Sequence, residues 1–276
     1  MSKVPFITLH NGVAMPQLGL GVWQVPDDEA EQTVATALEA GYRSIDTAAV
    51  YGNEKGTGKA VTSSGIAREE LFVTTKVWNS HQGYDATLRA FDVSLGKLGL
   101  DYVDLYLIHW PMPAKDTYVD TYRALEKIHA DGRAKAIGVS NFKPEHLERL
   151  MGETSVVPAV NQIELHPQLQ QSGVRDFHAE HGIATEAWSP LGQGKGLLRA
   201  PTVVAVARKH DRTPAQVVLR WHLQVGNVVI PKSVTPSRIQ ENIDVFDFEL
   251  DADDMAAFAA LDESKRLGPD PSDINS

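Results

Sequence analysis

The chain has 276 residues, and 42% of them are hydrophobic, a length and composition that suit a globular protein with a full buried core. Its 26 basic and 36 acidic residues give a formal net charge of -10, which argues against general binding to nucleic acid or to anionic membranes. Because there is no cysteine, disulfides, thiolate nucleophiles and cysteine metal sites are excluded.

The first ten residues do not have the pattern of a secretion signal. Residues 1–10 lack a basic segment followed by an apolar run, so no signal peptide is expected. No apolar stretch approaches the roughly 20 residues that span a bilayer. We therefore expect a cytoplasmic protein that binds neither membrane nor nucleic acid, and we expect it to be a monomer.

The first predicted element is a β-hairpin. Two short apolar runs lie on either side of Asn11-Gly12, a dipeptide typical of tight hairpin turns. After this hairpin the pattern changes to a short apolar run, a loop and a helical stretch, repeated along the rest of the chain.

Several of the intervening stretches have the pattern of helices. Residues 85–98 place leucine and phenylalanine side chains on one face, with the 3.6-residue period of a helix. Pro144 and Pro214 each mark the first turn of a further helix, a position that proline favours. Acidic residues open the last predicted helix, within 250–262, where they complement the helix dipole.

The short apolar runs read as strands that end on polar or aromatic residues. Successive ends lie about one βα unit apart, roughly 30 residues. The end residues are Asp46, Lys76, His109, Ser140, Gln162 and Trp188. Alternating strands and helices predict an α/β protein with a parallel sheet, and about eight such units predict closure into a (β/α)8 TIM barrel. We expect one domain over residues 1–276, with 264–276 as a loop over the barrel mouth.

Side chains with useful chemistry gather at these strand ends. Active sites of such barrels lie at the C-terminal ends of the strands, so Asp46, Lys76 and His109 should face one cavity, with Tyr51 close behind Asp46. A tyrosine has a pKa of about 10, and a nearby ammonium lowers it. Lys76 would supply that ammonium and Asp46 would hold it charged, while His109 would position a carbonyl oxygen. Each residue alone is more often a cap, a solvated charge or a packing residue, but their convergence predicts general acid catalysis by Tyr51.

A series of motifs in chain order gives the sequence its resemblance to a known family. They are GYRSIDTAAVYGNE (41–54), TTKVWN (74–79), DLYLIHWP (104–111), GVSNF (138–142), NQIELHP (161–167), WSPLGQG (188–194) and IPKS (230–233). The chain resembles the aldo-keto reductases throughout, and most of all the bacterial branch that includes 2,5-diketo-D-gluconic acid reductases. The resemblance implies reduction of aldehydes and ketones, among them diketo sugar acids or other small dicarbonyls. Hydride would come from NADPH, and Tyr51, Asp46, Lys76 and His109 would form the catalytic tetrad.

The resemblance also assigns the residues that would hold the nicotinamide half of the cofactor. Ser140, Asn141 and Gln162 would bind the carboxamide, and Trp188 would stack on the nicotinamide ring. The following loop would bind the pyrophosphate through backbone N–H groups. Its residues are Ser189, Leu191, Gly192, Gln193 and Gly194.

The other end of NADPH carries a phosphate on the adenosine ribose, which needs dedicated cations in a protein of charge -10. Lys232 and Arg238 supply them, and Pro236 is expected to start a helix whose N-terminus adds N–H donors. The chain should therefore prefer NADPH over NADH. The remaining contacts implied by the resemblance at this end are Ile230, Ser233, Val234, Glu241 and Asn242.

Aromatic side chains are expected around the substrate. Three of the five tryptophans, Trp23, Trp78 and Trp110, follow strand ends, and together with His109 they should form the walls of a substrate pocket. Packing in the core is the alternative for each of them.

Three other interpretations stay open. A barrel glycosidase would need two carboxylates at strand ends, and Glu164 and Glu186 fall near such ends. A non-enzymatic member of the family is the second possibility, which the complete tetrad disfavours. A metal site is the third, but His178 and His181 do not have the i, i+4 spacing of a zinc-binding helix, and we predict no metal.

Overall fold

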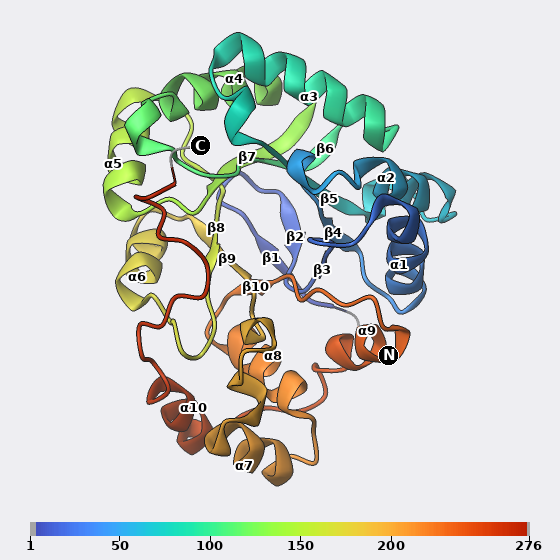
Figure 1. The fold of residues 1–276 in the computed structure, drawn as a ribbon, viewed down its shortest axis with the longest axis vertical. Coiled ribbons are helices and arrows are strands. Elements are labelled where there is room, and N and C mark those ends of the chain that lie inside the picture. Colours follow the sequence, from blue (N-terminus) through green and yellow to red (C-terminus); the bar gives the residue numbers. More distant parts are fainter. Residues whose placement is uncertain (1–3, 275–276) are drawn as a thin grey trace.

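The computed structural model describes residues 4–274, and a closed ring of eight parallel strands lies at the centre of this part of the chain (Figure 1). The strands follow one another around the ring in chain order: β3 (Leu20–Gly21), β4 (Ser44–Asp46), β5 (Phe72–Val77), β6 (Val103–Ile108), β7 (Ala134–Ser140), β8 (Val160–Glu164), β9 (Ala184–Trp188) and β10 (Val228–Val229). The amide of Gly19, just before β3, donates to the carbonyl of Val229 at 2.8 Å and joins the first strand to the last. The predicted (β/α)8 barrel is confirmed.

The helices surround the strands on the outside of the ring (Figure 1). They are α1 (Asp27–Glu39), α2 (Glu54–Ser63), α3 (Tyr84–Leu98), α4 (Tyr118–Ala130), α5 (Pro144–Glu153), α6 (Ser172–Glu180), α7 (Pro201–Lys209), α8 (Pro214–Gln224), α9 (Pro236–Ile243) and α10 (Ala252–Ala259). The prolines expected at helix starts occupy the first turns of α5, α8 and α9. Within residues 4–274, none of the helices is both long enough and apolar enough to cross a membrane.

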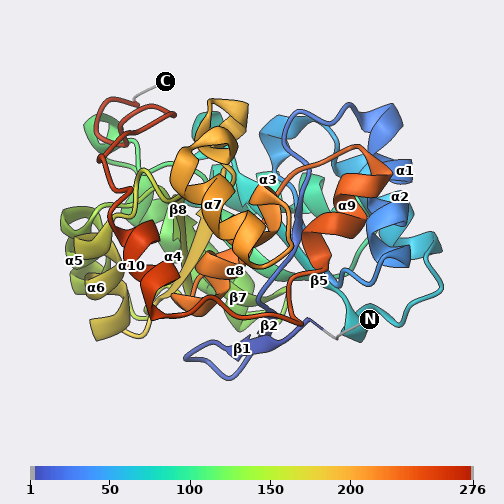
Figure 2. The same ribbon diagram turned by 90° about the horizontal axis from the view of Figure 1, so that it is seen from below.

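The hairpin closes one end of the barrel. Its strands β1 (Phe6–Thr8) and β2 (Ala14–Pro16) pair antiparallel around the turn at Gly12, whose φ of 85° suits glycine. Leu9 and Met15 are buried against inward-facing residues of the barrel strands. Figure 2 shows this hairpin on the side of the barrel opposite the C-terminal tail. The hairpin therefore covers the end of the barrel where the strands begin. The other end, at the C-terminal ends of the strands, is open to a ligand.

Candidate active site

A buried ion pair forms the floor of the open end. Asp46 is the last residue of β4, and Lys76 is the last residue but one of β5. Lys76 Nζ donates to Asp46 Oδ1 at 2.6 Å and to the carbonyl oxygen of Thr47 at 2.9 Å, and both charged side chains are almost fully buried. Burial alone lowers the pKa of Lys76, but the charge and hydrogen bond of Asp46, together with Tyr51 and Glu186, outweigh the burial and raise that pKa above its ordinary value. Lys76 is therefore a fixed ammonium.

Two further side chains extend this floor to the neighbouring strands. Gln162 Nε2, on β8, donates to Asp46 Oδ2 and to Glu186 Oε2, both at 2.8 Å. Burial, together with the charge of Asp46, raises the pKa of Glu186 to about 8. The Glu186 carboxyl is therefore mostly protonated near neutral pH, and the floor carries one negative charge opposite one positive charge.

Tyr51 lies above the ion pair, at the end of a short helical turn (Ala49–Tyr51) that follows β4. Its ring centroid is 5.2 Å from Lys76 Nζ. Burial raises the pKa of Tyr51; the charge of Lys76 lowers it, whereas Asp46 and Glu186 raise it, and the net direction is upward. The net direction is therefore opposite to the expected lowering, and Asp46 contributes to that difference, although Lys76 acts in the expected direction. The reason is the loss of water around the hydroxyl, and the consequence is a phenol that keeps its proton.

His109 lies between two aromatic rings, directly after β6. Its ring meets Tyr51 edge-on with centroids 5.6 Å apart, and Trp78 in the same way at 5.1 Å. Burial and the charge of Lys76 hold the pKa of His109 well below its ordinary value. Within residues 4–274, Nδ1 of this ring has no hydrogen-bond partner. The ring is thus neutral and offers a polar atom near Tyr51.

The residues expected around the nicotinamide form one chain of hydrogen bonds. Ser140 Oγ donates to the carbonyl of Gln162 at 2.8 Å, and Asn141 Nδ2 donates to Ser140 Oγ at 3.0 Å. Trp188 Nε1 donates to Asn141 Oδ1 at 2.8 Å, which fixes the plane of the indole beside the floor. The structure thus brings these residues together next to the tetrad.

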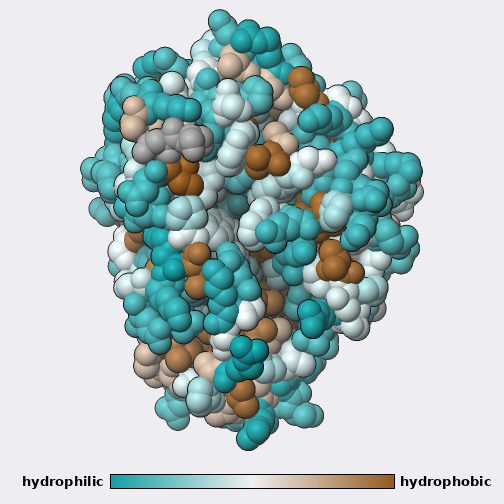
Figure 3. All heavy atoms as spheres, viewed as in Figure 1, coloured by the Kyte–Doolittle hydropathy of each residue, from teal (hydrophilic) through white to brown (hydrophobic). Residues whose placement is uncertain are grey.

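A cavity of about 1150 Å³ opens above the floor, and the face that Figure 3 shows is hollowed near its centre. It is large for a ligand site, since pockets that bind small molecules typically have volumes of about 300–1,000 Å³. The predicted residues that line it are Trp23, Asp46, Tyr51, Trp78, His109, Trp110, Ser140, Asn141, Gln162, Trp188, Ser189, Leu191, Gln193, Gly194, Ile230, Lys232, Ser233, Val234, Arg238, Glu241 and Asn242. Trp23, Trp78 and Trp110 thus line the same cavity as His109.

Two predicted residues do not line this cavity in the described chain. Lys76 is fully buried beneath it, and Gly192 is buried behind its own loop, where an added Cβ would lie 2.9 Å from Leu197. The sequence reasoning missed Gly268 and Pro269 of the tail as individual lining residues. The predicted position of 264–276 over the mouth was the signal for them, and within the described part of this segment Gly268 and Pro269 line the cavity; 275–276 fall outside the described residues.

Two cations that make no ion pair lie at the far end of the cavity. Lys232 and Arg238 are exposed, and neither forms an ion pair within the described part of the chain. Ser233 also lines this part of the cavity, and its hydroxyl accepts from the amide of Thr235 at 3.1 Å. An anionic group could therefore bind both cations without breaking an existing pair.

The carboxylates of the glycosidase interpretation do not face the cavity. Among the described residues that line it, neither Glu164 nor Glu186 occurs. Glu186 lies in the floor, and Glu164 accepts hydrogen bonds from the tail backbone at Leu267 and Gly268. This arrangement does not support glycoside hydrolysis.

The histidines considered for a metal have structural partners. His178 is buried between Asn161 and Thr185, at 2.9 and 2.8 Å, and His181 stacks on Phe177. No group of His, Asp and Glu within residues 4–274 is arranged to hold a metal ion.

The sequence is similar to that of known reductases over almost its whole length. The model of the Aldo/keto reductase family matches residues 13–263. An aldo-keto reductase of Mycolicibacterium smegmatis is 59% identical over 271 residues, which cover 98% of each chain. The methylglyoxal reductase DkgA of Yersinia pestis is 54% identical over 98% of each chain. The glyoxal reductase of Bacillus subtilis is 54% identical over 97% of this chain and 96% of its own.

Solved structures of similar sequence have the same fold as this chain. An aldo/keto reductase from Brucella melitensis has a TM-score of 0.92 and 59% identity, over 95% of this chain and 99% of its own. A variant of Gox0644 in complex with NADPH has a TM-score of 0.95 and 53% identity, over 99% of each chain.

Proposed function

The chain belongs to the aldo/keto reductase family and is an NADPH-dependent oxidoreductase that reduces carbonyl groups, and from this premise we propose that its substrates are small dicarbonyl compounds and that Tyr51 is its general acid. One observation carries the proposal: a protonated Tyr51 and a neutral His109 lie together above the buried Asp46–Lys76 pair, at the bottom of the cavity.

The residues present fit the cofactor at both ends of the cavity. Gln162 Nε2 donates both of its N–H groups, to Asp46 and Glu186, and the amide is thereby oriented. Its Oε1 accepts no hydrogen bond within residues 4–274 and would accept from a carboxamide. At the far end, Lys232 and Arg238 have the charge that a ribose phosphate requires. When bound, NADPH would supply the hydride that attacks the carbonyl carbon.

The proton for the carbonyl oxygen would come from Tyr51. As negative charge develops on that oxygen, the Tyr51 hydroxyl donates its proton, and a phenolate is left behind. The ammonium of Lys76 stabilises this phenolate, and Asp46 keeps the ammonium in place. Solvent then restores the proton. Lys76 thus acts on the product side of the proton transfer, which agrees with a Tyr51 pKa that is raised before any ligand is bound.

His109 would orient the carbonyl. A neutral imidazole donates one hydrogen bond without competing for the proton that Tyr51 provides. Its ring is held between Tyr51 and Trp78, so its direction is fixed before the substrate arrives.

The proposed substrate class rests on the walls of the cavity and on the relatives. Trp23, Trp78 and Trp110 line the cavity with flat apolar side chains, which suit a compact substrate. The relatives from Yersinia pestis and Bacillus subtilis, each 54% identical, are named as methylglyoxal and glyoxal reductases. Methylglyoxal, glyoxal and diketo sugar acids are therefore the proposed substrates.

The test is NADPH consumption by the purified protein. Glyoxal, methylglyoxal, 2,5-diketo-gluconate and a simple monoaldehyde of similar size would be compared by kcat/KM, with loss of NADPH absorbance as the readout. We expect a dicarbonyl to exceed the monoaldehyde by at least about tenfold. If the monoaldehyde equals every dicarbonyl, the proposed substrate class is wrong. If no carbonyl consumes NADPH, the proposed catalytic role of Tyr51 is wrong as well.

A further inference from the structure

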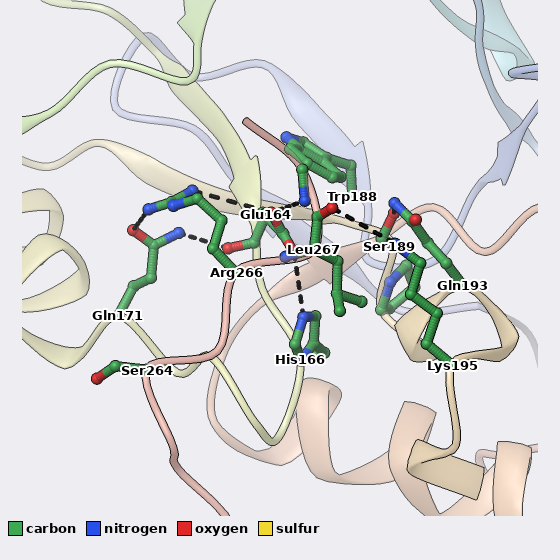
Figure 4. Close-up of polar contacts among 12 residues, drawn as sticks. Glu164, His166, Gln171, Trp188, Ser189, Gln193, Lys195, Ser264, Arg266 and Leu267 are labelled. Carbon is green, nitrogen blue, oxygen red and sulfur yellow. Dashed lines mark hydrogen bonds and ion pairs between the residues drawn. The ribbon is translucent and has the colours of Figure 1, made fainter. Parts of the chain in front are cut away.

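The C-terminal tail lines one side of the cavity at Gly268 and Pro269, and one buried carboxylate ties it to the barrel. Glu164 is the last residue of β8 and is fully buried. Its Oε1 accepts from the amide of Leu267 at 2.6 Å, and its Oε2 accepts from the amide of Gly268 at 2.9 Å (Figure 4). Both carboxylate oxygens therefore bind consecutive backbone amides of the tail.

The surroundings of Glu164 keep it ionised. Burial alone raises the pKa of Glu164, but hydrogen bonds from His166, Gly268 and Leu267 lower it below its ordinary value. His166 Nε2 lies 3.2 Å from Oε1, and Arg266 Nη1 lies 3.9 Å from Oε2. The hydrogen bonds to the tail are thus charge-assisted, which makes them roughly twice as strong as neutral ones.

The segment held by Glu164 touches Trp188. A Cβ added to Gly268 would lie 2.6 Å from Trp188 Cη2, so the tail backbone packs directly against the outer edge of the indole. The other side of the same ring is fixed by its hydrogen bond to Asn141. Gly268 and Pro269 also line the cavity. The position of the tail therefore sets both the Trp188 ring and one wall of the cavity.

Further side chains bind the tail near Gly268. Lys195, from the loop after β9, reaches the carbonyl of Leu267 at 3.5 Å (Figure 4). Farther along, Lys143 forms an ion pair with Asp270 at 2.7 Å and a hydrogen bond to Ser272 at 2.8 Å. Lys195 is exposed and Lys143 is half-buried, so Glu164 is the fully buried member of this series of contacts.

We propose that Glu164 is a positioning residue for carbonyl reduction: it holds the tail backbone against Trp188, and it thereby retains the cofactor and shapes the substrate wall. This inference rests on the proposed function, because Trp188 matters only if the nicotinamide lies against it. Loss of the Glu164 charge would free the tail, loosen the Trp188 edge and open the cavity toward solvent.

The first variant is Glu164→Gln, which keeps the side-chain volume and one acceptor oxygen but places an NH₂ group against the second amide. Its matched control is Glu126→Gln, because Glu126 also accepts from consecutive amides, those of Ser155 and Val156 at 2.6 and 2.7 Å, away from the cavity. For Glu164→Gln we expect tryptic cleavage after Lys265 or Arg266, NADP+ release and KM for methylglyoxal each to rise about tenfold. The control should leave all three unchanged.

A second variant reaches the same contact from the other side. Gly268→Ala keeps Glu164 but forces the tail away from Trp188, so it should reproduce the rise in NADP+ release and in KM. In the double variant, NADP+ release and KM should rise little beyond their values in either single variant, because both substitutions act through the same contact between the tail and Trp188. A fall in melting temperature for Glu164→Gln without faster cleavage and faster NADP+ release would overturn the proposal. Cleavage and NADP+ release need no turnover, so they test this inference even if the wild-type protein reduces no dicarbonyl.

Discussion

The buried pair between Asp46 and Lys76 gives the sharpest test of how the barrel supports its site. The perturbation is Lys76→Met, which keeps an unbranched side chain only one atom shorter and removes its charge. In the folded protein the two groups are 2.6 Å apart, with side-chain exposures of 0% and 3%. Removing one partner leaves an uncompensated buried charge on Asp46.

The expected loss of stability follows from that burial. Breaking a buried ion pair by removing one partner costs about 3–5 kcal/mol, a large part of the roughly 5–15 kcal/mol that holds a domain folded. For a chain of this size, each kcal/mol lowers the melting temperature by roughly 2 °C, so a fall of about 6–10 °C is expected.

Thermal unfolding followed by circular dichroism measures this deficit. The matched control is Lys59→Met, since Lys59 is also 2.6 Å from its partner Glu31 but both side chains are exposed, at 65% and 39%. An exposed pair is worth at most about 1 kcal/mol, so the control should shift by roughly 2 °C or less. The double variant Lys76→Met/Asp46→Asn should regain part of the stability but none of the turnover. Equal melting temperatures for Lys76→Met and Lys59→Met would refute the reasoning.

Further predictions concern the proton donor, the cofactor and the floor. Tyr51→Phe should lower kcat about 10²- to 10⁴-fold while NADPH still quenches tryptophan fluorescence with unchanged affinity; near-normal turnover would contradict its role as general acid. Arg238→Ala should raise the Kd for NADPH about tenfold and leave NADH unchanged, whereas equal weakening of both cofactors would make Arg238 structural. Because the folded pKa of Glu186, about 8, lies above its unfolded value, the wild-type protein loses stability as pH rises from about 4.5 to about 8. Glu186→Gln should gain stability relative to wild type across that window, and parallel stability curves would speak against a buried protonated carboxyl. With an enone, His109 should favour carbonyl reduction, and product analysis that finds a saturated double bond beside an intact carbonyl would count against this assignment.

Local signals in the sequence were sufficient for most of the fold. Asn11-Gly12 marks the hairpin because this dipeptide is typical of tight turns with positive φ. The turn forms there, and Gly12 has a positive φ. Pro144 and Pro214 mark helix starts because proline needs no amide donor in the first turn, and α5 and α8 begin at them. The polar strand ends predicted a shared site because parallel strands of a barrel terminate on one side.

The interactions that the sequence could not show join distant residues through a buried polar network. Nothing near Glu164 in the chain indicates that its partners are the amides of Leu267 and Gly268. The role of Glu186 is equally hidden, because its raised pKa depends on burial and on Asp46 across the barrel. The direction of the Tyr51 pKa also differed from expectation, since desolvation has no local sequence signal.

The manner in which the tail is anchored has an evolutionary consequence. Glu164 binds main-chain amides, and every residue other than proline has one, so substitutions at Leu267 leave the anchor intact. Gly268 is the exception, because of its contact with Trp188. Substitutions at Pro269 and beyond do not remove the hydrogen bonds of Glu164 to Leu267 and Gly268. New preferences among carbonyl compounds can thus arise by drift in a short terminal stretch, without remodelling of the ancestral barrel.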